Sequence, residues 1–241
     1  MQKLMTYETL RYFSYSNDKI CVAPIKGIVI DFFGLGCQDM YHEDTPFGKE
    51  LAGKGIILVI PYNNPWAWMN EQSVHYTDEI ISILMDHYTL PESVPIVSSG
   101  GSMGGLSALV YTTYTKRTPV ACAANCPVCD LVYHYTERPD LPRTLYSAFF
   151  QNKEDCLEDA LKTASPIHLI NNMPKIDYYI FHCENDTAVN QEKHSDQFVS
   201  MMKKTHHVTY HTIPGREHCD LPDDIWKIYS EYIINAILNK S

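Results

Sequence analysis

The hydrophobic and polar positions of the chain alternate between two kinds of segment. Several short runs are apolar at nearly every position, which is typical of strands buried on both faces of a sheet. These runs span residues 26–31, 55–60, 95–99, 119–124, 176–182 and 207–213. Between them, apolar residues recur at helical spacing, most clearly over residues 80–88 and 225–237. Strands that alternate with helices predict an α/β fold with a mainly parallel sheet and helices on both faces.

Two segments depart from this alternation. Residues 7–18 alternate aromatic and polar side chains and end in a turn signal, so we expect antiparallel strands at one edge of the sheet. Residues 130–174 are rich in proline and aromatic residues and contain no clear strand, so we expect short helices that form a cap over the sheet. Because no repeat or low-complexity linker interrupts the sequence, we expect a single domain over residues 1–241.

Composition and charge narrow the function classes. Hydrophobic residues make up 45% of the chain and no apolar run approaches the ~18 residues of a membrane span. The first residues lack the apolar core of a signal peptide, so we expect a cytoplasmic protein whose eight cysteines are reduced thiols. A net charge of −10 without a Lys/Arg cluster argues against nucleic acid as a partner. The sequence leaves the oligomeric state open.

A glycine-rich stretch, "SSGGSMGG", occupies residues 98–105 between an expected strand and an expected helix. Its centre fits GxSxG, the nucleophile elbow, in which glycines let one serine stand on a strained turn. A phosphate-binding loop would need a lysine after the glycines, and a dinucleotide fingerprint would need an acidic residue at a set distance. Neither is present, so the stretch predicts Ser102 as a nucleophile and predicts no cofactor.

Two later loops supply partners for this serine. Asp186 follows the expected strand 176–182, and His218 follows the expected strand 207–213. The order Ser, Asp, His, with each residue after a later strand, is the order of α/β-hydrolases. Asp130, which follows the strand 119–124, is an alternative acid because some related enzymes take the acid from the preceding strand.

These motifs give the chain a resemblance to a known family. "GGSMGG", "SPIHLI…FHCENDTAV" and "PGREH" resemble the α/β-hydrolase fold, and more closely the catalytic domain of the prolyl oligopeptidase family and its esterase relatives. The resemblance runs from about Gly27 onward. It implies a catalytic triad of nucleophile Ser102, acid Asp186 and base His218.

The same mechanism needs two N–H donors for the oxyanion. One expected donor is the backbone N–H of Met103, directly after the nucleophile. The other comes from the loop after the strand 26–31, where relatives commonly carry a His-Gly motif. This chain has Phe33-Gly34-Leu35 there, and we expect the donor to be the N–H of Leu35.

The function that this reading favours is hydrolysis of a small carboxylic ester through an acyl-enzyme. The alternative is a serine peptidase or aminopeptidase, which the resemblance also allows. Members of that family commonly carry a large additional N-terminal domain that restricts access to peptides, and we expect none here. The expected substrate is therefore a small ester or, in the alternative, a short peptide.

Aromatic residues in two loops are candidates for the substrate pocket. We expect Trp66, Trp68, Tyr133 and Tyr146 to line it, although about half of such aromatics seal a cap against a sheet instead.

The spacing of the two cysteines in "CPVC" is one that zinc sites use. With the preceding cysteine it offers three candidate ligands, Cys122, Cys126 and Cys129. A closed zinc site usually needs a second such pair, which the sequence lacks. We therefore expect these thiols to pack as small apolar groups, and we expect no metal.

Overall fold

The computed structural model describes residues 4–240 and contains one seven-stranded sheet in the order β1-β3-β2-β4-β5-β6-β7. The strands are β1 (Ser14–Ser16), β2 (Gly27–Phe32), β3 (Ile56–Pro61), β4 (Ile96–Gly101), β5 (Ala121–Asn125), β6 (Asp177–Cys183) and β7 (His207–Ile213). β1 runs antiparallel to β3, and every other neighbouring pair is parallel. The six strands expected from the apolar runs are confirmed, each within two residues of its expected ends.

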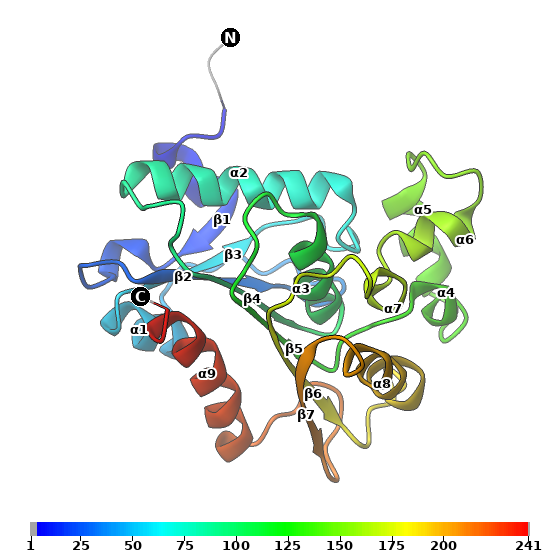
Figure 1. Cartoon of the computed structure of the whole chain (residues 1–241). Helices are drawn as coiled ribbons and strands as arrows, with labels where there is room; N and C mark the ends of the chain where they lie inside the picture. The colour runs from blue at the N-terminus through cyan, green and yellow to red at the C-terminus, as the bar shows by residue number, and fades with distance from the viewer. Residues whose placement is uncertain (1–3, 241) are drawn as a thin grey trace.

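Helices cover both faces of this sheet (Figure 1). They are α1 (Pro46–Gly53), α2 (Glu71–His87), α3 (Met103–Tyr114), α4 (Leu131–His134), α5 (Leu141–Phe149), α6 (Leu157–Lys162), α7 (Pro166–Leu169), α8 (Gln197–Met202) and α9 (Asp223–Leu238). α1 and α9 pack on one face, while α2, α3 and α8 pack on the other. The expected α/β fold with a doubly covered sheet is confirmed.

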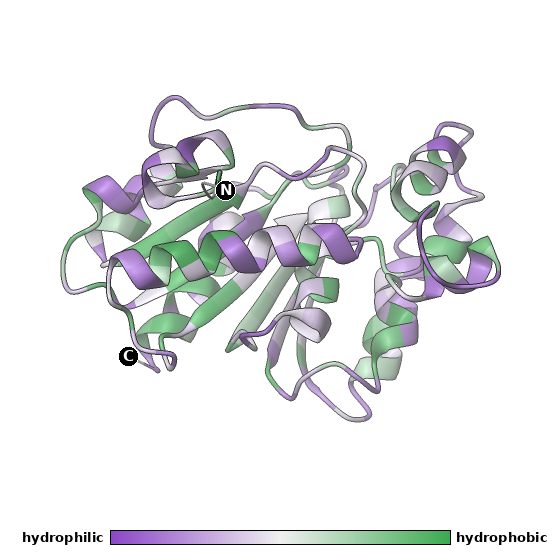
Figure 2. Ribbon diagram, turned by 90° about the horizontal axis from the view of Figure 1, so that it is seen from above, coloured by the Kyte–Doolittle hydropathy of each residue, from purple (hydrophilic) through white to green (hydrophobic). Residues whose placement is uncertain are grey.

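The strands are apolar throughout because each face meets a separate core. In β2, Ile28 and Ile30 face the core under α2 and α3, whereas Val29 between them faces the core under α1 and α9. All three side chains are fully buried. The strands therefore appear as hydrophobic ribbons between helices that carry polar outer faces (Figure 2).

The two irregular segments have different outcomes. Residues 130–174 do form short helices, α4 to α7, which lie toward the right of Figure 1. The expected edge strand is right only for β1, because Tyr7–Tyr12 form a 3-10 helix. At the start of that helix the Thr6 N–H donates to the Thr9 hydroxyl (2.9 Å) and the Thr9 N–H donates to the Thr6 carbonyl (3.1 Å), so local capping outweighs the alternating pattern.

No helix within residues 4–240 is both long and apolar enough to cross a bilayer.

The backbone of α3 packs directly against the backbone of the strands beneath it, with no side chain between them. A Cβ atom added to Gly104 would lie 2.0 Å from the carbonyl oxygen of Phe32, and one added to Gly100 would lie 2.5 Å from the Gly104 carbonyl. Real Cβ atoms do not approach other atoms so closely. The first turn of α3 can therefore sit against β2 and β4 only because glycine occupies both positions.

Gly104→Ala is expected to destabilise the fold, because the clash is with backbone rather than with a movable side chain. Overpacking of this kind costs about 1–3 kcal/mol or more, and each kcal/mol lowers the melting temperature of a chain of this size by roughly 2–4 °C. Gly53→Ala is the matched control: Gly53 lies in α1 with nothing within 4 Å of its added Cβ. A lower melting temperature for Gly53→Ala than for Gly104→Ala would contradict this account.

Candidate active site

Ser102 occupies a strained turn between β4, which ends at Gly101, and α3, which begins at Met103. Its backbone angles are φ 60° and ψ −125°, a region that costs a non-glycine residue of order 1–3 kcal/mol. Two hydrogen bonds hold it there: the Ser102 N–H donates to the Asn125 carbonyl (2.9 Å), and the Ser102 carbonyl accepts from the Leu106 N–H (3.1 Å). The geometry is that of a nucleophile elbow, with the side chain only half-buried.

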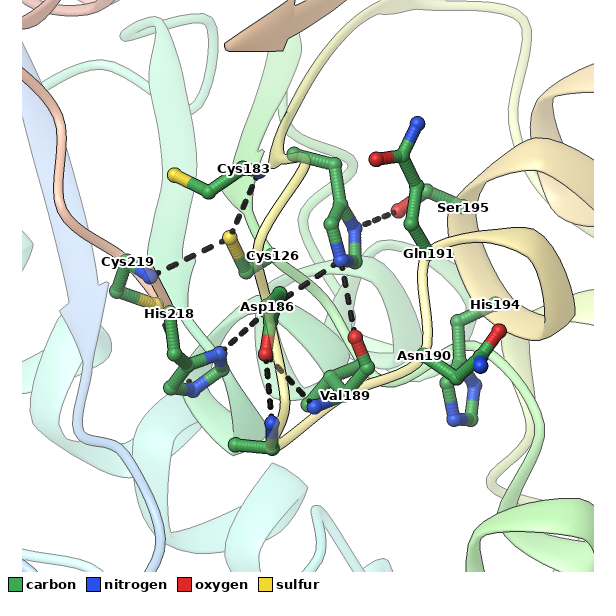
Figure 3. Close-up of polar contacts among 12 residues, drawn as sticks. Cys126, Cys183, Asp186, Val189, Asn190, Gln191, His194, Ser195, His218 and Cys219 are labelled. Atoms are coloured by element: carbon green, nitrogen blue, oxygen red, sulfur yellow. Dashed lines mark hydrogen bonds and ion pairs between the residues drawn. The ribbon is translucent and has the colours of Figure 1, made fainter. Parts of the chain in front are cut away.

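Asp186 and His218 lie together after β6 and β7, as Figure 3 shows. The Nδ1 of His218 is 2.6 Å from Oδ2 of Asp186. The other carboxylate oxygen, Oδ1, accepts the backbone N–H groups of Ala188 (2.8 Å) and Val189 (2.9 Å). Burial alone would raise the pKa of Asp186, but hydrogen bonds from His182, His218 and Val189 hold that pKa well below its usual range.

A second histidine supports this carboxylate, and the sequence reasoning missed it. The Nε2 of fully buried His182 lies 3.1 Å from the Val189 carbonyl and 3.3 Å from Oδ2 of Asp186. Since a carbonyl oxygen only accepts, Nε2 carries the proton and donates toward both oxygens. The Nδ1 of His182 is 2.6 Å from the Ser195 hydroxyl. The signal in the sequence was its place, a polar residue inside an apolar strand four residues before Asp186.

Asn125, the last residue of β5, connects the serine turn to the histidine loop. Its carbonyl accepts the Ser102 N–H, and its Nδ2 donates to the carbonyl of Cys219 (3.3 Å). A Cβ added to Gly101 would lie 3.2 Å from Sγ of Cys219, so that thiol rests on the base of the turn.

Within residues 4–240 no hydrogen bond joins the Ser102 hydroxyl to His218. The Nε2 of His218 lies 3.7 Å from Sγ of Cys219.

The environment of His218 favours its charged form. Burial alone would lower the pKa of the imidazole, but its interactions with Asp186 and Cys126 raise that pKa to about 9. The side chain is 26% exposed, so the ring remains accessible from one side.

Cys126 lies beside this histidine and not in an isolated apolar pocket. Its Sγ accepts the backbone N–H groups of Cys183 and Cys219, each at 3.4 Å. Cys122 and Cys129 are fully buried in the core under α3. The expectation that the three thiols pack as small apolar groups therefore fits Cys122 and Cys129 but omits the polar contacts of Cys126.

The alternative acid, Asp130, has another role. Its Oδ1 accepts the N–H groups of Val132 (2.9 Å) and Tyr133 (3.1 Å), so it caps the first turn of α4. Of the two candidate carboxylates, Asp186 makes the contact with His218.

The four aromatic pocket candidates are placed differently from one another. Trp68 is fully buried, and its Nε1 donates to the Thr144 hydroxyl at 3.0 Å, so it seals the cap to the sheet and is not a pocket wall. Trp66 is 41% exposed and lines an open cleft of about 390 Å³. Tyr146 is exposed and bonds to the hydroxyl of Tyr135, while Tyr133 packs edge-on against His194.

Comparison with known proteins identifies the fold and the family. The chain has the α/β-hydrolase fold, and its structure superposes on several hydrolases. Pyrococcus horikoshii acylaminoacyl peptidase is similar over 88% of this chain with 13% identity and a TM-score of 0.69, but the match spans only 37% of the peptidase's length. The esterase Est2 of Thermogutta terrifontis, in its propionate-bound form, is 19% identical with a TM-score of 0.66, over 94% of this chain and 88% of the esterase.

A third similar structure is Est1E of Butyrivibrio proteoclasticus, which is 17% identical with a TM-score of 0.59 over 94% of this chain and 93% of that protein. No curated protein matches the sequence.

The model of the prolyl oligopeptidase family matches residues 78–231, which is more than half of the 241 residues. The chain belongs to the prolyl oligopeptidase family and is by class a serine hydrolase.

A buried network connects the cap to the short π-helix Glu192–Asp196 that follows β6. Glu137 accepts hydrogen bonds from Nδ1 of His134, from Nε2 of His194 (2.8 Å) and from the Asn190 N–H (3.1 Å). The Nδ1 of His194 accepts the N–H groups of Cys129 and Asp130, so this ring is neutral with its proton on Nε2. Burial also lowers the pKa of His134. One carboxylate thus anchors α4 to the loop beyond Asp186.

This network should make stability depend on acid pH. Burial alone would raise the pKa of Glu137, but the bonds from the two histidines lower that pKa from 4.5 to about 2. A depressed carboxyl pKa stabilises the fold above the unfolded value and loses that contribution as the pH falls from about 4.5 to 2. Urea unfolding of Glu137→Gln should therefore lose less stability over this window than wild type.

Glu154→Gln, at an exposed position in the cap, is the control and should follow the wild-type profile. Parallel profiles for wild type and Glu137→Gln between pH 5 and 2 would refute the assignment.

Proposed function

We propose that the chain hydrolyses a small carboxylic ester through an acyl-enzyme, with Ser102 as nucleophile, His218 as base and Asp186 as the acid. The observation that carries the proposal is the 2.6 Å bond between His218 Nδ1 and a buried Asp186. Nε2 of His218 lies 3.7 Å from Sγ of Cys219, the thiol that rests on Gly101 next to Ser102. A strained serine, a carboxylate-oriented imidazole and a helix N-terminus form the arrangement that acyl transfer requires.

In this mechanism the neutral Nε2 of His218 accepts the Ser102 proton as Oγ attacks the ester carbonyl. Asp186 holds the ring through Nδ1–H and stabilises the imidazolium that forms. His218 then returns the proton to the departing alkoxide, and a water attacks the acyl-enzyme by the same route in reverse. His182 keeps Asp186 in position, because a carboxylate with four donors around it has one favoured orientation.

Two backbone N–H groups are suited to the oxyanion. Met103 is the first residue of α3, where helix geometry leaves N–H groups without an intrahelical acceptor and the helix dipole favours negative charge. Gly34 lies beside the elbow, since its added Cβ would be 3.9 Å from the Ser102 Cβ, and Leu35 follows it. In the described part of the chain neither the Met103 nor the Leu35 N–H is bonded to another protein group, which supports both as donors.

An ester is favoured over a peptide as the substrate class. The likeness to the two esterases runs over about nine-tenths of both chains. Esters also expel an alkoxide more readily than amides expel an amine, so they need less help from a well-placed acid. Trp66, Tyr76 and Phe150 line an open cleft whose mixed polar and aromatic walls suit a small acyl or sugar ester, but Ser102 and His218 are not among the residues that line it.

The identity of the acid can be tested with two matched substitutions. Asp186→Asn should lower kcat by up to ~10⁴, because an amide fixes the wrong tautomer of His218. Asp130→Asn should change kcat little, since asparagine caps a helix about as well as aspartate. Steady-state ester hydrolysis by both variants is the measurement, and a larger loss in Asp130→Asn would move the acid to that residue.

The nucleophile and the bond class are tested together. A fluorophosphonate probe should label wild type covalently, and Ser102→Ala should abolish labelling and lower turnover by up to ~10⁶, by analogy with another serine triad. Acetyl and butyryl esters should give a higher kcat/KM than aminoacyl arylamides. The assays should span pH 7 to 9, because only the neutral imidazole accepts a proton and the pKa of His218 is raised to about 9. Robust Ser102-dependent cleavage of arylamides would replace the esterase by the peptidase alternative.

A further inference from the structure

Three side chains that can bind a metal converge beside the serine turn. One metal-binding atom each of Cys126, Cys219 and His218 lies within 4.8 Å of the other two. Cys126 comes from the end of β5, whereas His218 and Cys219 are consecutive residues in the loop after β7. The zinc spacing that the sequence analysis considered and set aside paired Cys126 with Cys129, so the fold brings together a different set.

The spacing of these atoms matches a tetrahedral zinc site. Zn–S bonds of about 2.3 Å and Zn–N bonds of about 2.0–2.1 Å place neighbouring ligand atoms about 3.6 Å apart. The Nε2 of His218 and Sγ of Cys219 are separated by 3.7 Å. Sγ of Cys126 lies within 4.8 Å of Sγ of Cys219 and of a ring nitrogen of His218. Thiolate and imidazole together favour zinc or copper over magnesium or calcium.

The surroundings of the three atoms resemble the supporting shell of known metal centres. The Nδ1 of His218 is held by Asp186, which leaves the Nε2 lone pair available and repeats the carboxylate–histidine–metal arrangement. The Sγ of Cys126 accepts two backbone N–H groups, which stabilise negative charge on the sulfur. His218 is 26% exposed and Cys219 is half-buried, so an ion can enter from their side.

Two other clusters in residues 4–240 have comparable spacing, but hydrogen bonds already occupy them. In the set Cys126, His182 and Asp186, both nitrogens of His182 are engaged, with Ser195 and with the Val189 carbonyl. In the set His134, Glu137 and His194, both nitrogens of His194 are engaged, and Glu137 already accepts hydrogen bonds from both rings. In the set around His218, the contact of Nε2 is the 3.7 Å approach to Sγ of Cys219, which is itself a member of the set.

We propose that Cys126, Cys219 and His218 form an inhibitory binding site for a thiophilic divalent cation, with zinc as the ion that fits. The two thiols release their protons to solvent on binding, and the fourth position of the tetrahedron is left for water. The ion takes the Nε2 lone pair that the base needs to accept the Ser102 proton, so occupancy blocks hydrolysis. The inhibition rests on the proposed function, whereas the binding does not.

Binding is tested without reference to activity by titrating chelator-treated protein with Co²⁺. Wild type should take up one Co²⁺ per chain with thiolate-to-cobalt charge-transfer absorption, and Zn²⁺ should displace it. Cys219→Ser and Cys126→Ser should each weaken Zn²⁺ binding by at least ~10–100-fold, the loss that even an outer-shell change causes. Because Cys126 is buried, the partly exposed Cys219→Ser carries the conclusion if Cys126→Ser fails to fold, as judged by circular dichroism.

Cys156→Ser is the matched control, since Cys156 is an exposed thiol 3.2 Å from the Asp159 carboxylate. It should bind Zn²⁺ as wild type does. Unaltered cobalt absorption in Cys219→Ser, or loss of the signal in Cys156→Ser, would overturn the site.

Inhibition is tested by the rates of ester hydrolysis and of fluorophosphonate labelling at increasing Zn²⁺. Both rates should fall in proportion to occupancy in wild type and Cys156→Ser, and a chelator should restore them. Cys219→Ser should need at least ~10-fold more Zn²⁺ for the same fractional loss. Saturating Zn²⁺ that leaves both rates unchanged would overturn the inhibition. If no ester is hydrolysed and no label forms, the proposed function fails while the cobalt titration still decides the site.

Discussion

The site depends on backbone-to-backbone contact between the first turn of α3 and the strands β2 and β4. Gly100 and Gly104 meet there with no room for a Cβ atom, and the chain between them must turn too sharply for an ordinary residue. Ser102 accepts the left-handed conformation because the packed core on either side over-determines it. The strain therefore follows from the way the helix is seated on the sheet. It also directs the first N–H groups of α3 toward the serine.

A second constraint is the burial of Asp186. A carboxylate without solvent is costly unless hydrogen bonds replace the water, and here two backbone N–H groups and two histidines do so. His182 is fully buried, while His218 is partly exposed. The inner histidine thus fixes the carboxylate, while the outer one keeps one side of its ring accessible. The hydrogen bonds that offset the free-energy cost of burying the Asp186 charge also fix the orientation of the His218 imidazole.

Sequence patterns predicted what local chemistry determines, namely the buried strands, the serine turn and the loops that carry Asp186 and His218. They did not predict contacts between segments far apart in the chain. Asn125 bonds to Cys219 across 94 positions, and Cys126 accepts the Cys219 N–H across 93. The sequence places Trp68 in the pocket because it lies in the loop after the strand 55–60, and loops at the carboxyl ends of strands form pocket walls. Its backbone has φ 48°, which turns the ring inward to bond with Thr144.

The same contacts that assemble the site also bring thiols to it. Asn125 has to end β5 beneath the serine turn in order to accept the Ser102 N–H, so the next residue, Cys126, starts its loop directly under the histidine segment. Cys219 follows His218, and its φ of 58° seats its thiol on Gly101. Neither sulfur lies on the elbow, which Ser102 occupies. Their position beside Nε2 of His218 follows from the meeting of three strand ends at one point.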